Sequence, residues 1–104
     1  MKYDLVIVNG NVVLEKEVTK KNIGVIDGKI AAIFEGNDYE VDKTIDAKGK
    51  YILPGAIDTH THFFEPGADY REDFMHGTKA AASGGFTTIM EMPNSNPPLA
   101  AAFV

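Results

Sequence analysis

Short runs of apolar and β-branched residues, separated by turn residues, fill the first half of the chain. The segment 22–34 is the clearest case, because two such runs flank Asp27-Gly28. This dipeptide favours the positive φ angles of a two-residue hairpin turn. Further strands are predicted at 3–8, 12–14 and 44–46 (the last at a sheet edge), turns at 9–11 and 47–50, and exposed polar loops at 15–21 and 35–43. Residues 1–52 therefore predict a small all-β module, and they contain no pattern of metal ligands or of a nucleophile.

The pattern changes near Leu53-Pro54-Gly55, where an apolar segment leads into a strand predicted at 56–62. After a loop, a helix is predicted from residue 70 or 71 to 83, with Glu72 and Asp73 in its first turn. Gly84-Gly85 is predicted to end this helix, and a second strand is predicted at 86–92. Strand, helix and strand over this length predict a βαβ unit, with a parallel strand pair and a right-handed crossover.

One face of the predicted helix carries mainly small and apolar residues, which would allow close packing on a sheet: Phe74, Gly77, Thr78, Ala81 and Ala82. The polar loop 93–98 closes the second strand, and the apolar segment 99–104 stands where a further helix would begin.

The composition narrows the classes of protein that this chain can represent. Its 104 residues, 44% of them hydrophobic, suffice for one small domain but not for a barrel of about 250 residues. A formal net charge of −5 argues against nucleic acid as a partner. The sequence contains no basic amphipathic stretch for a membrane surface, no signal peptide and no membrane span. The absence of cysteine fits a reducing compartment, so we expect a cytoplasmic protein.

Two histidines stand out at the end of the strand predicted at 56–62. Side chains on a strand alternate between its faces, so Asp58, His60 and His62 are expected to point the same way. Two imidazoles at this spacing can hold one metal ion, and the Pro-Gly that follows places them at the end of the strand. Asp58 would hydrogen-bond nearby backbone or a ligand histidine, or would itself coordinate the metal. The alternative for the histidines is an exposed strand without function.

The segment Pro54-Gly55-Ala56-Ile57-Asp58-Thr59-His60-Thr61-His62 resembles the first-strand signature of the amidohydrolase superfamily. Phe64-Glu65-Pro66-Gly67, Gly84-Gly85-Phe86-Thr87-Thr88 and the segment 92–98 are similar to the cyclic amidohydrolase branch, above all to dihydroorotases and allantoinases and more distantly to hydantoinases. The resemblance implies an α/β parent with a metal-dependent (β/α)8 barrel and a small β-sandwich domain. Residues 1–52 would then be sandwich strands, and residues 53–104 would be the first strand–helix–strand of the barrel.

The resemblance also implies roles for individual residues. His60 and His62 would hold the more buried ion of a two-metal site, usually zinc, which activates a water and polarises the substrate carbonyl. Asn94 matches the family asparagine that hydrogen-bonds the substrate's ring amide, although a turn-forming role is equally open. Phe64 stands where dihydroorotases usually carry an arginine for the substrate carboxylate, which favours an allantoinase; alternatively, its ring packs against the loop. Glu91-Met92-Pro93 points weakly in the same direction.

The family's remaining ligands and its general base have no counterpart in this chain, so no catalytic residue is expected within it. His76 and Lys79 fall in the predicted helix without a role in the site, and Arg71 is most simply part of a charged helix start. We therefore expect the first metal-binding motif of a hydrolase that opens a cyclic amide or ureide, with a homo-oligomeric parent and a small-molecule substrate. The alternative is a non-catalytic fragment that associates with itself or completes a partner.

Overall fold

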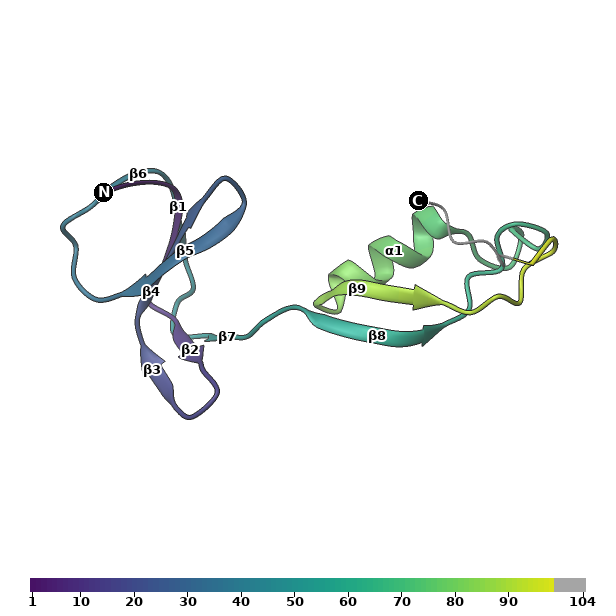
Figure 1. The fold of residues 1–104 in the computed structure, drawn as a ribbon, viewed down its shortest axis with the longest axis horizontal. Helices are drawn as coiled ribbons and strands as arrows, with labels where there is room; N and C mark the ends of the chain where they lie inside the picture. Colours follow the sequence, from purple (N-terminus) through teal and green to yellow (C-terminus); the bar gives the residue numbers. More distant parts are fainter. Residues whose placement is uncertain (99–104) are drawn as a thin grey trace. The chain divides into compact units, whose positions relative to one another are not determined.

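The computed structural model describes residues 1–98 and divides the chain into two units, Met1–Pro54 and Gly55–Val104 (Figure 1). The boundary predicted from the sequence lies between residues 52 and 53. The predicted segment 99–104 lies outside the described residues. None of the helices in residues 1–98 has the length and apolar character needed to cross a membrane.

The first unit contains a four-stranded sheet in the order β5-β4-β1-β6 (Figure 1). Its strands are β1 (Lys2–Val8), β4 (Asn22–Ile26), β5 (Lys29–Phe34) and β6 (Glu40–Asp46). β4 pairs antiparallel with both β1 and β5, whereas β6 pairs parallel with β1. The predicted hairpin is confirmed, since Asp27 and Gly28 have φ angles of 50° and 71° between β4 and β5. The Asp27 N–H also donates to the carboxylate of Asp4 at 2.7 Å.

A second sheet of this unit has the order β3-β2-β7, formed by β3 (Val18–Lys20), β2 (Asn11–Val13) and β7 (Tyr51–Ile52). The prediction of a loop over 15–21 is therefore wrong at β3, and β6 begins at Glu40 within the segment predicted as a loop. Both strands keep most of their side chains exposed, and both owe their conformation to backbone pairing with β2 or β1. The predicted strand at 44–46 is the end of β6. The polar residues of β3 and of the first part of β6 carry no hydrophobic period from which a strand could be predicted.

The core of the first unit is formed by side chains of β1, β2 and β4. Val6 is fully buried, and Tyr3, Val12 and Ile23 are nearly so. Tyr3 stacks on Phe34 with ring centres 5.3 Å apart, and a Cβ on Gly24 would overlap the Tyr3 ring. The first unit is thus held by a small aromatic and aliphatic core.

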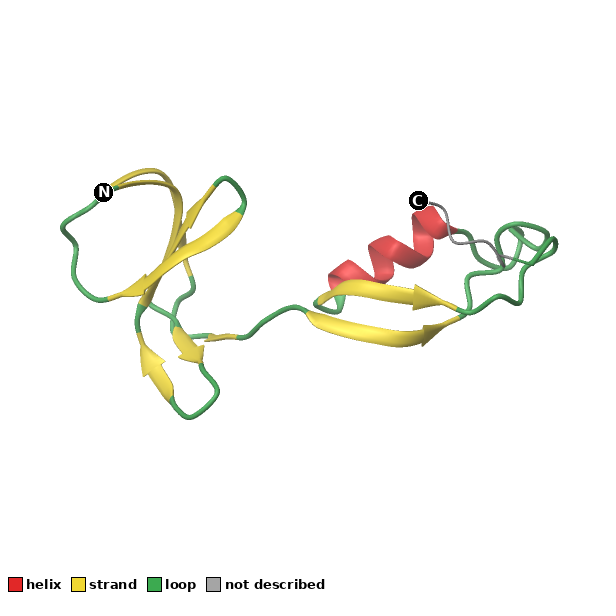
Figure 2. Ribbon diagram, viewed as in Figure 1, coloured by secondary structure: helices red, strands yellow, loops and turns green. Residues whose placement is uncertain are grey.

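The second unit is the predicted βαβ element. β8 (Ala56–Thr61) and β9 (Phe86–Glu91) form a parallel pair, and α1 (Phe74–Ser83) connects them and lies alongside the two strands (Figure 2). Both strands end one residue before their predicted ends at 62 and 92. The predicted end of the helix is confirmed, because Gly84 caps it and Gly85 adopts a φ of 86°.

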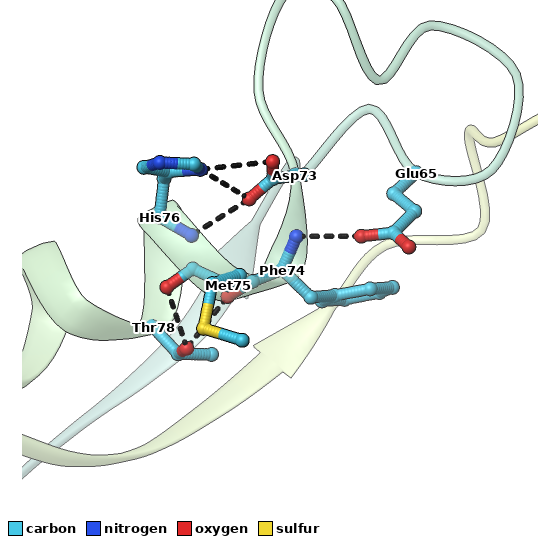
Figure 3. Close-up of polar contacts among 6 residues, drawn as sticks. All are labelled: Glu65, Asp73, Phe74, Met75, His76 and Thr78. Carbon is cyan, nitrogen blue, oxygen red and sulfur yellow. Dashed lines mark hydrogen bonds and ion pairs between the residues drawn. The ribbon is translucent and has the colours of Figure 1, made fainter.

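The predicted start of the helix is wrong. Asp73 has extended backbone angles and caps the helix, its carboxylate accepting the His76 N–H at 2.7 Å. The carboxylate of Glu65 accepts the Phe74 N–H at 2.7 Å, so two acidic side chains satisfy the first turn (Figure 3). Glu72 and Asp73 therefore lie before the helix, because aspartate bonds the backbone from a capping position more favourably than from inside a helix.

Candidate metal-binding site

The two motif histidines lie together at the end of β8. Their ring centres are 5.1 Å apart, with the ring planes inclined at 64°, and both residues are exposed. His60 belongs to β8, whereas His62 lies one residue beyond its end. The expected approach of the two imidazoles is therefore present, although the strand that carries them is shorter than predicted.

β8 contains a bulge immediately after Asp58. Asp58 pairs with Ile89 and Thr61 pairs with Glu91, so one more residue lies on β8 than on β9 between these pairs. The His60 N–H donates to Oδ1 of Asp58 at 3.1 Å, a local bond within this irregular stretch. Asp58 thus contacts the backbone of a motif histidine, which is one of the arrangements that the sequence analysis considered. Bulges of this kind re-aim side chains near functional sites.

Glu91, the last residue of β9, contacts the backbone beside His62. Its two carboxylate oxygens lie 2.8 and 2.9 Å from the Phe63 amide nitrogen, and Oε2 is 3.1 Å from the Thr61 hydroxyl. The Met92 N–H donates to the Thr61 carbonyl at 2.9 Å and extends the link between the two strand ends. From the sequence, Glu91 stands out only through its resemblance to the family motif. An acidic residue at the end of the neighbouring predicted strand was the available signal.

The spacing of the histidine rings fits a shared metal ion. Two imidazoles bound to one tetrahedral zinc through nitrogen, at about 2.1 Å, hold their ring centres about 5 Å apart. The observed 5.1 Å agrees with this value. Within residues 1–98, no group of three or more His, Cys, Asp or Glu side chains gathers around one point. The described part of the chain therefore brings together two imidazoles as candidate ligands, with no third such side chain beside them.

Phe64 follows the second histidine by two residues and carries a cation on its ring. The guanidinium carbon of Arg71 lies 4.4 Å from the ring centre, an arrangement that is favourable for a cation over an aromatic face. Phe64 is half-buried, whereas Arg71 is exposed. A positive group thus lies next to Phe64, the position at which, by the resemblance, dihydroorotases usually carry an arginine.

Asn94 lies in the loop after β9 and is exposed. Its N–H donates to the Met92 carbonyl at 2.9 Å, and the Asn96 N–H donates to the Pro66 carbonyl at 2.9 Å. The loop after β9 therefore contacts the loop after β8. The backbone hydrogen bond of Asn94 is consistent with a turn. Because Asn94 is exposed, the predicted contact of its side chain with a substrate stays open as a prediction.

His76 is not part of the histidine pair. Its Nδ1 lies 2.8 Å from the carboxylate of Asp73, and its side chain is 78% exposed (Figure 3). His76 lies in α1, as predicted, and outside the histidine pair. The backbone N–H and the ring of His76 both hold the pKa of Asp73 below its ordinary value.

Comparison with known proteins agrees with the motifs. The profile of the "Amidohydrolase family" matches residues 51–104. A dihydroorotase from Methanothermobacter thermautotrophicus is 53% identical over 77 residues, which are 74% of this chain and 18% of that protein. An allantoinase from Escherichia coli is 49% identical over 94 residues, which are 89% of this chain and 20% of that protein. The chain thus spans about a fifth of the length of these curated relatives.

Solved structures are similar as well. L-hydantoinase (dihydropyrimidinase) from Arthrobacter aurescens superimposes with a TM-score of 0.86 at 40% identity, over 92% of this chain and 22% of that chain. An N-acyl-D-glutamate deacylase from Bordetella bronchiseptica, solved with zinc and a phosphonate inhibitor, gives 0.65 at 28% identity, over 86% of this chain and 18% of that chain. The motif resemblance is confirmed, and because the family profile matches just over half of its residues, the chain belongs to the amidohydrolase family.

Proposed function

We propose that this chain is the N-terminal part of a metal-dependent hydrolase that opens a cyclic amide or ureide at a carbon–nitrogen bond. The observation that carries the proposal is the 5.1 Å spacing of the His60 and His62 rings, which suits two ligands of one zinc ion. The similarity to an allantoinase, a dihydroorotase and a hydantoinase supports the reaction class. Allantoin-like ureides are our first choice of substrate.

In this proposal, His60 and His62 hold the metal, and Asp58 fixes the His60 backbone through its hydrogen bond. A bound divalent ion, most simply zinc, supplies Lewis acidity toward the ring carbonyl. Asn94 offers an amide that can both donate to and accept from a cyclic ureide. The further ligands and the general base come from parts of a (β/α)8 barrel outside these 104 residues, and the first unit belongs to a small β-sandwich domain. The parent is a cytoplasmic homo-oligomer.

Exposed apolar surface on the second unit supports a barrel in which more strands follow. Ile57 on β8 is 60% exposed and Met90 on β9 is 50% exposed. A two-stranded sheet is too small to be stable without further packing, and additional strands and helices would cover these side chains. The same surface also favours the alternative of a non-catalytic module that associates with itself. A monomeric chain in solution at high concentration would argue against that alternative.

Hydrolysis of a ring that carries a carboxylate, such as dihydroorotate, is the second candidate. It is favoured by the Arg71 guanidinium over the Phe64 ring. Stacking uses the flat face of a guanidinium and leaves its in-plane N–H donors free for a carboxylate. Exchange of the aligned segment of the Escherichia coli allantoinase for this chain provides the test. Ring opening of allantoin is expected, and loss of dihydroorotate turnover alone in Arg71→Ala would assign a carboxylate contact.

Zinc titration of the 104-residue chain tests the metal site directly. We expect weak binding of one ion, because the described residues supply two ligands, and loss of that binding in the double variant His60→Ala/His62→Ala. His76→Ala is the matched control, since it removes an exposed imidazole of the same unit and should leave zinc affinity unchanged. Unchanged binding in the double variant would contradict the assignment of the ligands.

A further inference from the structure

We propose that Glu91 is a positioning residue that holds the backbone N–H of Phe63 and contacts the hydroxyl of Thr61, on the two sides of His62, and so keeps the two imidazoles at their ligand spacing. The inference rests on the proposed metal site. It assigns to the end of β9 a role in a site whose histidines both come from β8 and the residue after it.

Glu91 contacts the residues immediately before and after His62. Both carboxylate oxygens accept the N–H of Phe63, at 2.8 and 2.9 Å, and one of them lies 3.1 Å from the hydroxyl of Thr61. Thr61 and Phe63 are the two neighbours of His62. His62 lies beyond the last residue of β8, so strand pairing ends immediately before it. The next backbone N–H, that of Phe63, is bonded by the Glu91 carboxylate instead of by a neighbouring strand.

The hydrogen bond from the Phe63 N–H to the Glu91 carboxylate is partly buried. Phe63 is only 8% exposed, so its N–H has poor access to water as a substitute partner, and loss of the acceptor leaves that donor unsatisfied. The Phe63 ring is also fixed, since it meets the Phe74 ring edge-on at 5.6 Å and lies against Gly77. His62 therefore directly precedes a residue whose backbone position depends on Glu91.

Three variants separate positioning from the other roles that a carboxylate can have. Glu91→Gln retains one acceptor oxygen at the same reach, so positioning predicts that it stays close to the wild type. Glu91→Asp keeps the charge but shortens the side chain by one methylene, so positioning predicts a loss. Glu91→Ala removes the acceptor altogether. A carboxylate that acts by its charge, or as a metal ligand, predicts the reverse order for Gln and Asp.

Glu65→Ala is the matched control. Glu65 is a half-buried carboxylate of the same unit that accepts the backbone N–H of another phenylalanine, Phe74, at 2.7 Å (Figure 3). It makes the same kind of bond at the start of α1 instead of beside His62. Its removal should therefore leave the spacing of the histidine rings and the zinc affinity within about threefold of the wild type, as expected for a residue outside the ligands' surroundings.

The experiment combines two readouts on the full 104-residue chain. In the metal-free state, nuclear Overhauser contacts between the His60 and His62 ring protons report their spacing, and hydrogen exchange reports protection of the Phe63 amide. Zinc titration then gives the affinity. We expect Glu91→Ala to lose both metal-free signals and to bind zinc about 10- to 100-fold more weakly, the usual effect of removing a partner outside the ligand shell. Glu91→Asp should lie between Ala and the wild type, and Glu91→Gln within about threefold of the wild type.

Retained ring contacts and zinc affinity in Glu91→Ala would overturn the inference, as would a larger loss in Gln than in Asp. If Glu91→Ala does not fold, the comparison of Asp with Gln still decides. If the wild-type chain binds no zinc, the proposed metal site fails by itself. The ring contacts and the Phe63 exchange then still determine whether Glu91 positions His62.

Discussion

The substitution Gly77→Ala has two opposite effects on stability at one buried position of α1, a gain in helix propensity and a steric clash. Alanine in a helix interior is normally about 1 kcal/mol more favourable than glycine. At Gly77, however, a Cβ would come within 2.5 Å of Cδ1 and 3.0 Å of Cζ of the Phe63 ring. These atoms would have to move apart by about 1 Å to reach ordinary van der Waals contact.

The surroundings of Phe63 decide which effect is larger. Its ring packs against Phe74, and its backbone N–H is held by Glu91, so the ring cannot recede without disturbing other contacts. Overpacking of this kind costs about 1 to 3 kcal/mol. Set against the gain in helix propensity of about 1 kcal/mol, this predicts that Gly77→Ala lowers the free energy of unfolding by about 1 kcal/mol.

Urea denaturation of the full chain, followed by the helical circular dichroism signal, measures this change. Because α1 is the single α-helix of residues 1–98, that signal reports the second unit. Ala80→Gly, on an exposed position of the same helix, calibrates the propensity term alone. In a Phe63→Leu background, which removes the outer ring atoms, Gly77→Ala should become neutral or stabilising. A gain of about 1 kcal/mol in the wild-type background would refute the steric argument.

Two further predictions concern other parts of the chain. Gly28→Ala should destabilise the β4–β5 hairpin by about 1 kcal/mol. Gly28 has a φ of 71° and open space around it, so the cost comes from backbone strain alone. Amide exchange in β4 and β5 measures the loss of stability, and unchanged protection would contradict the prediction. The hydrogen bonds from the backbone and ring of His76 lower the pKa of Asp73 below its ordinary 3.8, so the stabilisation of α1 is complete above that value and is lost as the pH falls through the lowered pKa. A helical signal monitored during acid titration should therefore decline less steeply in Asp73→Asn than in the wild type, and parallel declines would count against this role of Asp73.

Local sequence sufficed wherever one short segment decides its own conformation. Asp27-Gly28 formed the predicted turn and Gly84-Gly85 ended α1, because Asp27, Gly28 and Gly85 adopt positive φ angles that glycine above all tolerates. His60 and His62, two residues apart in the sequence, lie side by side as expected. The predicted start of α1 was wrong, since the capping hydrogen bonds of Asp73 and Glu65 outweighed the helical tendency of the preceding residues.

The sequence by itself thus determined the family, the order of strands and helix in the second unit, and the two histidines as the candidate ligands. Only the tertiary structure decided that β3 is a strand, that β6 begins at Glu40, that β8 bulges between Asp58 and Thr61, and that Glu91 holds the backbone beside His62. The physical reason is distance along the chain. Glu91 and Phe63 are separated by 28 residues, and the partner of a polar strand or of an unpaired N–H can be named only after folding has brought such segments together.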